Sequence, residues 1–286
     1  MQPNLIRACV GTVLGMAGAL ATMPPPVRAA AEITRTVYLS AVGATGAVVT
    51  DLTPADIVVK ENGQARQVTQ LGPATALAHV AVLVDDGGNG LMQSAVARLA
   101  ASMTGRANFS ISMLNPQPLR LNDFTGDFDV LRTSIGKIVQ RGRPPRDPLQ
   151  LVEAIGWAAR DLRKRELRRP VIVAFTNGGE SDSIDIARDI VNDLQQSEAS
   201  LHLVYVGGVP MGQVLIDGPT QSGGSSSLAN STQAFMQAAA AIAATLANQY
   251  RLSYVLPDGV KPHARLQVTT TRPDVRIAAP TRISDR

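Results

Sequence analysis

Two adjacent carboxylates follow the most apolar short run of the sequence, and they are its best candidates for binding chemistry. The run Val80–Val84 is unbroken and rich in β-branched residues, which is typical of a strand buried on both faces of a parallel sheet. Asp85 and Asp86 follow it, and helical spacing of apolar residues begins at Leu91. The turn between them consists of Gly87, Gly88, Asn89 and Gly90. Open α/β folds place their binding sites at such turns, although Asp, Asn and Gly also form turns that bind nothing.

The sequence shows no constellation of residues that is typical of catalysis. Its histidines are His79 at the start of the apolar run, His202 inside a predicted strand and His263 in a turn region, and none has a serine or cysteine partner at a known spacing. The polar turn lacks the lysine of a phosphate-binding loop. A formal net charge of +4 and an aromatic content of 3% also argue against nucleic-acid binding. We therefore expect neither an enzyme nor a nucleic-acid-binding protein.

Strand and helix patterns alternate from His79 to about Asn248, which predicts a doubly wound, mostly parallel sheet. The expected strands are Val80–Val84, Phe109–Leu114, Val171–Thr176 and Leu201–Val206, with a short antiparallel piece at Leu119–Asn122. The expected helices are Leu91–Met103, Phe128–Gln140, Leu149–Leu167, Ser183–Ser197 and Ser231–Gln249. Asp127 and Ser231 or Asn230 are suited to cap helices, and Ser222–Ser227 is expected to be a short flexible loop.

Both ends of this α/β region carry strand-like segments. Residues 33–72 contain an Asn62-Gly63 hairpin signal, and the region after residue 249 contains three further strand candidates separated by turns. We expect the two segments to pair as a small β-sandwich. The predicted division is 1–31, 32–73, 76–249 and 250–286.

Residues 1–31 have the pattern of a cleavable signal peptide. Arg7 precedes the apolar stretch Ala8–Thr22, and small residues follow at Ala29–Ala31. The apolar stretch is shorter than the about 20 residues that a membrane span needs. Cys9 is the only cysteine, so the exported chain would need no disulfide. We expect a periplasmic or secreted protein.

The turn at Asp85 resembles the first metal-binding motif of von Willebrand factor A domains, in which two serines follow an aspartate at alternate positions. Here these positions are Asp85, Gly87 and Asn89, so both hydroxyls are missing. The phrase TGAVVTDLTPADIVVKENGQARQV (45–68) resembles the leader of the bacterial VWFA-related family, and LANQYRLSYVLPDG (246–259) resembles its C-terminal strand. The resemblance covers about residues 33–280 and implies an A-type, Rossmann-like domain.

The resemblance implies one divalent cation, Mg²⁺, Mn²⁺ or Ca²⁺, held by oxygen ligands from three loops. On the third loop Asn177 stands in place of an aspartate, and on the second loop the threonine position falls on Leu149, which has no side-chain oxygen. We therefore predict a degenerate metal site with the remaining ligands Asp85, Asn89 and Asn177, and no certain cofactor. The predicted binding face around it consists of Asp86, Gly87, Gly88, Arg143, Arg146, Asp147, Gly178, Glu180 and Asp182.

Basic residues crowd the end of the helix expected at Leu149–Leu167. They are Arg160, Arg163, Lys164, Arg165, Arg168 and Arg169. Cations near a helix C-terminus are favourable, and Asp161 and Glu166 are available to pair with them. The alternative is a patch for anionic lipid headgroups or an acidic protein.

These observations predict an exported, non-catalytic module that binds a protein partner in the cell envelope. Two alternatives remain: a metal-dependent adhesin that binds a partner carboxylate through a cation, and a scaffold whose β-sandwich or arginine-rich helix makes the contacts. Contact with a membrane surface is not favoured.

Overall fold

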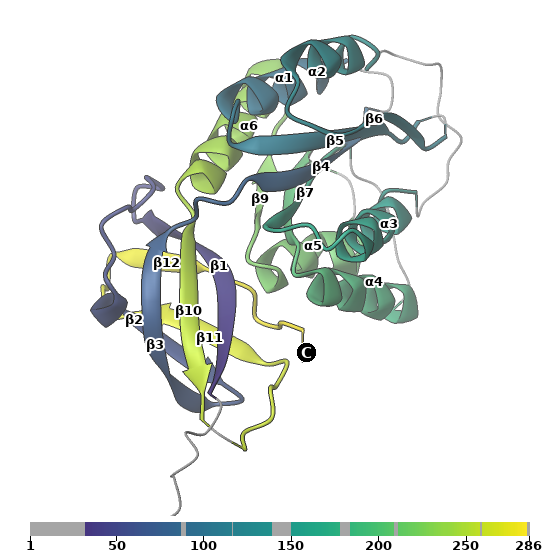
Figure 1. The fold of residues 1–286 in the computed structure, drawn as a ribbon. Coiled ribbons are helices and arrows are strands. Elements are labelled where there is room, and N and C mark those ends of the chain that lie inside the picture. Colours follow the sequence, from purple (N-terminus) through teal and green to yellow (C-terminus); the bar gives the residue numbers. More distant parts are fainter. Residues whose placement is uncertain are drawn as a thin grey trace, which may run out of the picture. The chain divides into compact units, whose positions relative to one another are not determined.

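Strand β4 (Ala78–Asp85) lies inside a mixed sheet with the strand order β6-β5-β4-β7-β8-β9 (Figure 1). The computed structural model describes residues 32–86, 90–115, 117–138, 150–177, 184–208, 211–257 and 259–284. The strands that run parallel to one another are β4, β5 (Ala107–Met113), β7 (Pro170–Thr176), β8 (Ser200–Tyr205) and β9 (Ser225–Leu228). Only β6 (Leu119–Thr125) is antiparallel to its partner in this described sheet. The predicted mostly parallel α/β sheet is confirmed.

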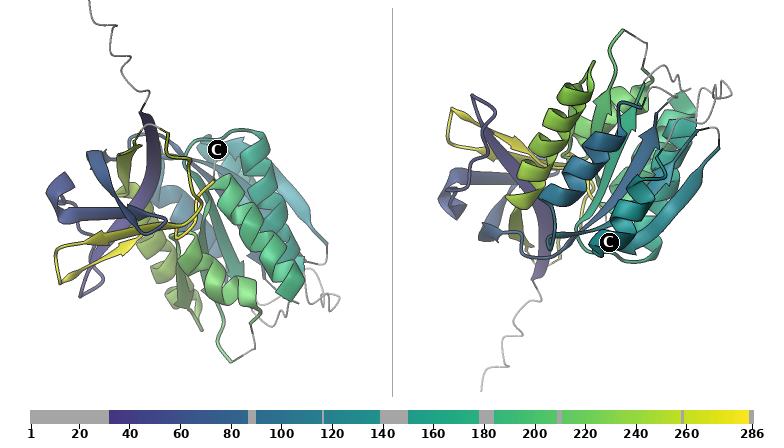
Figure 2. Two further views of the ribbon diagram at one scale, coloured as in Figure 1. Left: turned by 90° about the horizontal axis from the view of Figure 1, so that it is seen from below. Right: turned by 90° about the horizontal axis from the view of Figure 1, so that it is seen from above.

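Helices cover both faces of this sheet (Figure 2). One face packs against α1 (Gln93–Ser102), α2 (Phe128–Ile135) and α6 (Thr232–Ala247). The other face packs against α3 (Gln150–Lys164), α4 (Ile184–Ser197) and α5 (Gln213–Gln221). Because both faces are buried, β4 and β7 need continuous apolar runs, and this is the pattern that identified them in the sequence.

Two helix caps that the sequence predicts are confirmed. The Asp127 side chain accepts hydrogen bonds from the backbone N–H groups of Asp129 and Val130 at the start of α2. The Ser231 side chain accepts one from Ala234 at the start of α6. Each cap satisfies backbone donors that the first helical turn leaves without a partner.

The expected flexible loop at Ser222–Ser227 is wrong. Residues 225–228 form β9, which pairs in parallel with β8 from His202 to Tyr205, and α5 precedes it. Gly224 allows this close approach, because a Cβ atom there would lie 1.9 Å from the Leu201 carbonyl oxygen. The serine-rich sequence has no apolar alternation, so the pairing comes from β8 and not from local preference.

The strands at the two ends of the chain form a second, antiparallel sheet with the order β11-β2-β3-β10-β1-β12. Its members are β1 (Ile33–Gly43), β2 (Ile57–Glu61), β3 (Gln64–Pro73), β10 (Tyr250–Leu256), β11 (Leu266–Thr270) and β12 (Val275–Ala278). Asn62 and Gly63 join β2 to β3 with positive φ angles of 50° and 77°, as a tight hairpin turn requires. A short 3-10 turn at Pro54–Asp56 precedes β2.

This second sheet does not confirm the expected β-sandwich, because its strands form one sheet and not two facing layers. The edges of the sheet approach each other after β12: the Leu266 N–H donates to the Thr281 carbonyl over 2.9 Å, and the Ile283 N–H donates to the Ala264 carbonyl over 2.8 Å. The apolar residues enclosed by the strands include Leu39, Val59, Leu252 and Tyr254.

A buried ion pair crosses this sheet. The Glu61 side chain is fully buried and accepts hydrogen bonds from the Tyr254 hydroxyl at 2.7 Å and from Arg35 at 3.3 Å. Arg35 also donates to the Ser284 carbonyl, so the pair ties the end of the described chain to β1 and β2.

Residues Glu32–Arg286 form one compact unit. Among the described residues, no helix has the length and apolarity needed to cross a membrane.

Candidate functional site

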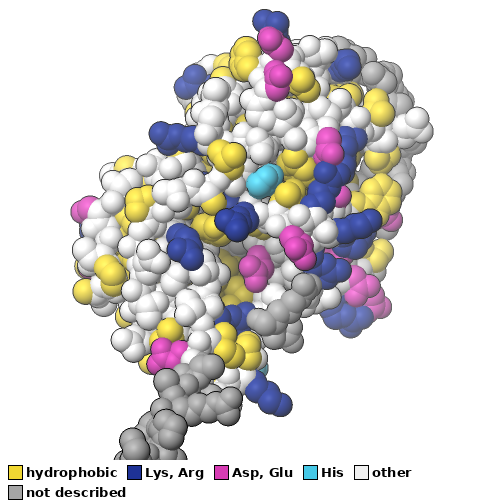
Figure 3. Space-filling view, in the orientation of Figure 1, with side chains coloured by type: hydrophobic (Ala, Val, Ile, Leu, Met, Phe, Trp, Pro, Cys, Tyr) yellow, Lys and Arg dark blue, Asp and Glu magenta, His cyan; other side chains and the backbone are white. Residues whose placement is uncertain are grey.

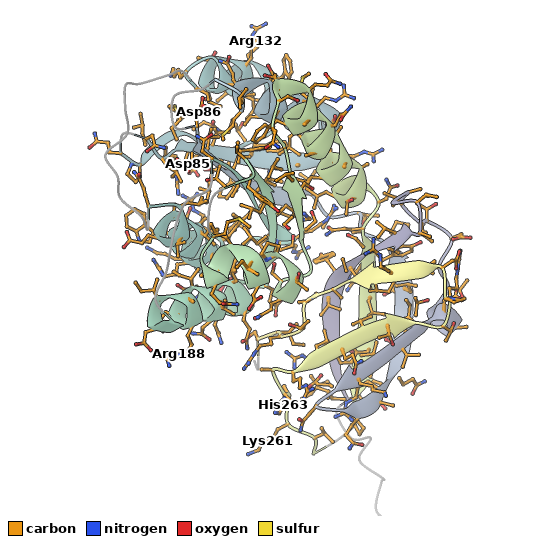
Figure 4. All side chains as sticks on the ribbon, turned by 180° about the vertical axis from the view of Figure 1, so that it is seen from behind. Asp85, Asp86, Arg132, Arg188, Lys261 and His263 are labelled. Carbon is orange, nitrogen blue, oxygen red and sulfur yellow. The ribbon has the colours of Figure 1, made fainter. Side chains whose placement is uncertain are left out.

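Asp85 ends strand β4 at the carboxyl edge of the parallel sheet, where the sequence places the binding turn (Figure 4). It lies opposite Thr176 in the pairing of β4 with β7, and the Thr176 hydroxyl donates to Asp85 Oδ2 over 2.7 Å. Asn115, just beyond β5, donates through its side-chain amide to Asp85 Oδ1. Both oxygens of the Asp85 carboxylate therefore accept hydrogen bonds from neighbouring side chains.

Asn177 and Asp86 complete the described part of this site. The Asn177 side-chain amide donates to the Asp85 backbone carbonyl over 3.1 Å, so it lies beside Asp85 as the sequence predicts. Asp86 is 4% exposed, and its Oδ1 accepts a hydrogen bond from the Gly90 N–H over 2.9 Å. This contact anchors the end of the turn that leads into α1.

The surroundings of Asp85 disfavour its ionised form. Burial raises the pKa of the Asp85 carboxyl, and the neighbouring Asp86 raises it further. The hydrogen bonds from Thr176 and Asn115 oppose this by lowering the pKa, but the net direction is upward. Burial therefore costs the ionised form more than these neutral donors return.

The remaining predicted site residues lie outside the described residues. They are Gly87, Gly88, Asn89, Arg143, Arg146, Asp147, Gly178, Glu180 and Asp182. Leu149, at the threonine position of the second loop, also lies outside the described residues. Among the described residues, no group of three or more His, Cys, Asp and Glu side chains is placed to hold a metal ion.

The sequence prediction missed two residues of the site, Asn115 and Thr176. Asn115 follows the predicted strand Phe109–Leu114, and Thr176 is the last residue of another predicted strand. Parallel strands end at the same edge of a sheet, so the positions of Asn115 and Thr176 in the sequence would have been enough to place them near Asp85.

A divalent ion does not fit the described side chains as they are arranged. Hard cations need several oxygen ligands, preferably carboxylates. Here the single carboxylate of Asp85 is already hydrogen-bonded at both oxygens, and the amides of Asn115 and Asn177 present N–H groups towards Asp85. Among the described residues, both oxygens of Asp85 are thus already engaged by side-chain donors.

The three histidines lie away from this site. His79 Nδ1 is 2.8 Å from the Arg168 carbonyl, and the exposed His263 accepts a hydrogen bond from the Arg265 N–H. His202 is 1% exposed, and its Nδ1 lies 2.9 Å from the Ser225 hydroxyl. Burial lowers the pKa of His202 to about 4, which makes its imidazole a weak base at neutral pH.

Part of the basic cluster at the end of α3 is paired with acids. Arg165 contacts Asp161 at 2.9 Å and Asp123 at 2.8 Å, and Arg160 contacts Asp193. Figure 3 shows basic and acidic side chains intermixed in this part of the surface. Glu166 makes no ion pair with the described residues, and Arg163, Lys164 and Arg168 are exposed. The predicted pairing is therefore confirmed for Asp161 and not for Glu166.

No protein-family model and no curated protein sequence matches the chain. Solved structures do match it. Their likeness is to von Willebrand factor A domains. A von Willebrand factor type A protein from Catenulispora acidiphila has 9% sequence identity and a TM-score of 0.40, over 87% of this chain and 74% of that one.

Two further solved structures match the chain. BatB from Bacteroides thetaiotaomicron has 13% identity and a TM-score of 0.42, over 58% of this chain and 98% of that one. Proximal thread matrix protein 1 from the mussel byssus, with a zinc-occupied MIDAS motif, has 11% identity and a TM-score of 0.49, over 66% of this chain and 50% of that one.

Proposed function

We propose that this chain is an exported, non-catalytic A-type module that binds a protein partner in the bacterial cell envelope without a divalent cation. The observation that carries the proposal is the hydrogen bonding of Asp85. Its two carboxylate oxygens accept from Asn115 and Thr176, so the side chain that would hold an ion is engaged by neutral donors. In this proposal the loops that follow β4 and β7 contact the protein partner directly.

The proposed contact surface, called the loop edge below, lies around the carboxyl ends of β4 and β7. In addition to Asp85, Asn89 and Asn177, its residues are Asp86, Gly87, Gly88, Arg143, Arg146, Asp147, Gly178, Glu180 and Asp182. Charged and polar loop residues on a rigid α/β scaffold suit protein recognition, because the sheet fixes the positions at which the loops begin. Export is proposed from the signal-peptide pattern of residues 1–31, and the segments 32–73, 76–249 and 250–286 are the proposed domain division.

The absence of catalysis is part of this proposal. His202 is the histidine with a hydroxyl partner, and its low pKa and its burial both argue against a role as general base. The carboxylates Asp85 and Asp86 adjoin each other and are used in local hydrogen bonds, with Asp86 holding Gly90.

The first test measures thermal unfolding of the protein in EDTA and then with Mg²⁺, Mn²⁺ or Ca²⁺. An ion at about one hundred times its dissociation constant stabilises a specific site by about 2.7 kcal/mol. We expect no change in melting temperature with any of the three ions. A rise that disappears in Asp85→Ala would instead establish the metal-dependent adhesin.

The second test asks which surface binds. The double variant Arg143→Glu, Arg146→Glu reverses two charges of the loop edge, and Arg163→Glu, Lys164→Glu makes the matched change on the exposed side of α3. Each protein captures partners from an envelope extract in EDTA. We expect a partner that the loop variant loses and the α3 variant keeps. The opposite loss would support the scaffold with its arginine-rich helix as the contact.

A further inference from the structure

A second candidate site lies at the opposite edge of the parallel sheet, where β7 and β8 begin. A cavity of about 250 Å³ lies there, and Pro170 and Ser200, the first residues of these strands, line it. Its charged lining residues are Arg168, Arg169 and Glu198, and its polar ones include Tyr38 and Gln249. Val37, Leu167 and Ile283 supply apolar wall. The lining thus combines a charged end with apolar surface, as small-molecule sites commonly do.

Arg169 is the unusual residue of this cavity, which we call the Arg169 cavity. Arg169 is 4% exposed, and its backbone has a φ of 51°, in the left-handed region that non-glycine residues rarely adopt. Its side chain donates to Gln249 Oε1 at 3.0 Å, to the carbonyl oxygens of Ala76 at 2.9 Å and Ala74 at 3.4 Å, and to the Leu246 carbonyl.

These hydrogen bonds leave the charge of Arg169 without a counter-ion. All four acceptors are neutral, and among the described residues Arg169 forms no salt bridge. Burial lowers the pKa of its guanidinium, because the charged form loses contact with water. A guanidinium has five N–H donors, so one remains beyond the four hydrogen bonds.

Two further features of the cavity are suited to an anionic ligand. Ser200 is 9% exposed, and its hydroxyl is buried and has no hydrogen-bond partner among the described residues. Arg168 lines the cavity with an exposed side chain that forms no described ion pair. With Glu198 on the same wall, the charged side chains of the described lining sum to one positive charge.

We propose that the Arg169 cavity binds a small organic monocarboxylate. The ligand's single negative charge matches the net charge of the lining, and its carboxylate would accept hydrogen bonds from the remaining Arg169 N–H and the Ser200 hydroxyl. Its apolar body would lie against Val37, Leu167 and Ile283. Inorganic phosphate is a mixture of monoanion and dianion at pH 7 and has no apolar body, so it matches the described lining less well.

Isothermal titration of the protein with benzoate, butyrate, benzamide and inorganic phosphate tests this assignment. We expect saturable binding of benzoate or butyrate that is at least about tenfold tighter than binding of the neutral benzamide or of phosphate. Ser200→Ala removes the unpartnered hydroxyl without adding bulk and should weaken carboxylate binding about tenfold. Arg168→Gln should weaken it severalfold.

Arg163→Gln is the matched control, since it removes the same charge from an exposed position of α3 that does not line the cavity. It should bind the carboxylate as the unchanged protein does. The proposal is overturned if no probe binds saturably, if benzamide equals benzoate, or if Ser200→Ala and Arg168→Gln bind like the control. Tighter binding of phosphate than of both carboxylates would overturn the choice of ligand. The melting temperature of each variant, measured without probe, shows that it is folded.

Discussion

Asp85 and Arg169 are buried or partly buried charges at opposite edges of the same sheet, and neither is paired with an opposite charge among the described residues. Asp85 accepts hydrogen bonds from Asn115 and Thr176, which are side chains at the ends of neighbouring strands. Arg169 donates to three backbone carbonyls and to Gln249. The two sites differ in their partners. The donors to Asp85 are side chains, which a substitution can remove, whereas most acceptors of Arg169 are backbone carbonyls, which no substitution removes.

Arg169 therefore has a structural role, whereas the side chains at Asp85 can be exchanged. The acceptors of Arg169 come from two connections between the sheets: Ala74 and Ala76 precede β4, while Leu246 and Gln249 flank the end of α6. One guanidinium therefore holds both places where the chain passes between the two sheets. Asp85 instead accepts from side chains at the ends of β5 and β7, at one edge of the α/β sheet.

The largest effect is predicted for Arg169→Met. It keeps much of the apolar stem but removes the donor of Gln249 Oε1 and of the Ala74 and Ala76 carbonyls. The Leu246 carbonyl still accepts from the Gln249 N–H at 3.5 Å. An unsatisfied buried group costs about 1–3 kcal/mol. We expect a loss of about 3–5 kcal/mol in the free energy of unfolding, measured by urea denaturation. Arg168→Met, at an exposed neighbouring position, should change it by less than about 0.5 kcal/mol. Equal losses in the two variants would show that Arg169 does not hold the connections.

His202 is a third buried ionisable side chain, and it avoids the cost of burying a charge by staying neutral. Its folded pKa of about 4 lies below the unfolded value of 6.5, so the stability that neutral His202 contributes is present above pH 6.5 and is lost as the pH falls towards 4. The unfolding free energy should fall by about 3 kcal/mol over this interval from His202 alone. The comparison of His202→Gln with the unchanged protein between pH 7 and pH 4 isolates this part of the slope.

The unchanged protein is the reference for this pH dependence. If His202→Gln keeps the full slope, the loss of stability in acid originates elsewhere, for example in the carboxylates.

The sequence predicted most of the α/β sheet because its strands are buried on both faces. Continuous apolar runs such as Val171–Phe175 leave little ambiguity, and the Asn62-Gly63 turn determines its own hairpin. Strand β9 could not be found in this way. Its residues Ser225–Ser227 have no apolar pattern, and only the pairing with β8 makes them a strand. The arrangement of the second sheet is likewise a long-range property that strand signals alone do not determine.

The candidate site was predictable in position but not in chemistry. The rule that binding turns follow parallel strands located Asp85, and the family resemblance added Asn177. The same rule applied to every strand would have added Asn115. The direction of each hydrogen bond was not predictable, because an asparagine can either donate or accept. Arg169 gave no signal of its own, since it stood within a run of basic residues whose members differ only in burial.

The smallest effect is predicted for Asp85→Asn, and it tests the replaceable side of the comparison. The raised pKa of Asp85 means that burial disfavours its ionised form, so its contribution to stability is present below the unfolded pKa of 3.8 and is lost as the pH rises through the folded pKa. A neutral amide avoids this loss and still accepts from Thr176. Its N–H₂ group then faces Asn115, whose side-chain amide must turn to present its oxygen. We expect Asp85→Asn to be more stable than the unchanged protein at pH 7, with the difference shrinking towards pH 4. Asp161→Asn, which removes an exposed ion-pair partner, should not be stabilising at pH 7. Destabilisation by Asp85→Asn at pH 7 would mean that the negative charge itself holds the loop edge, which would favour a cation there.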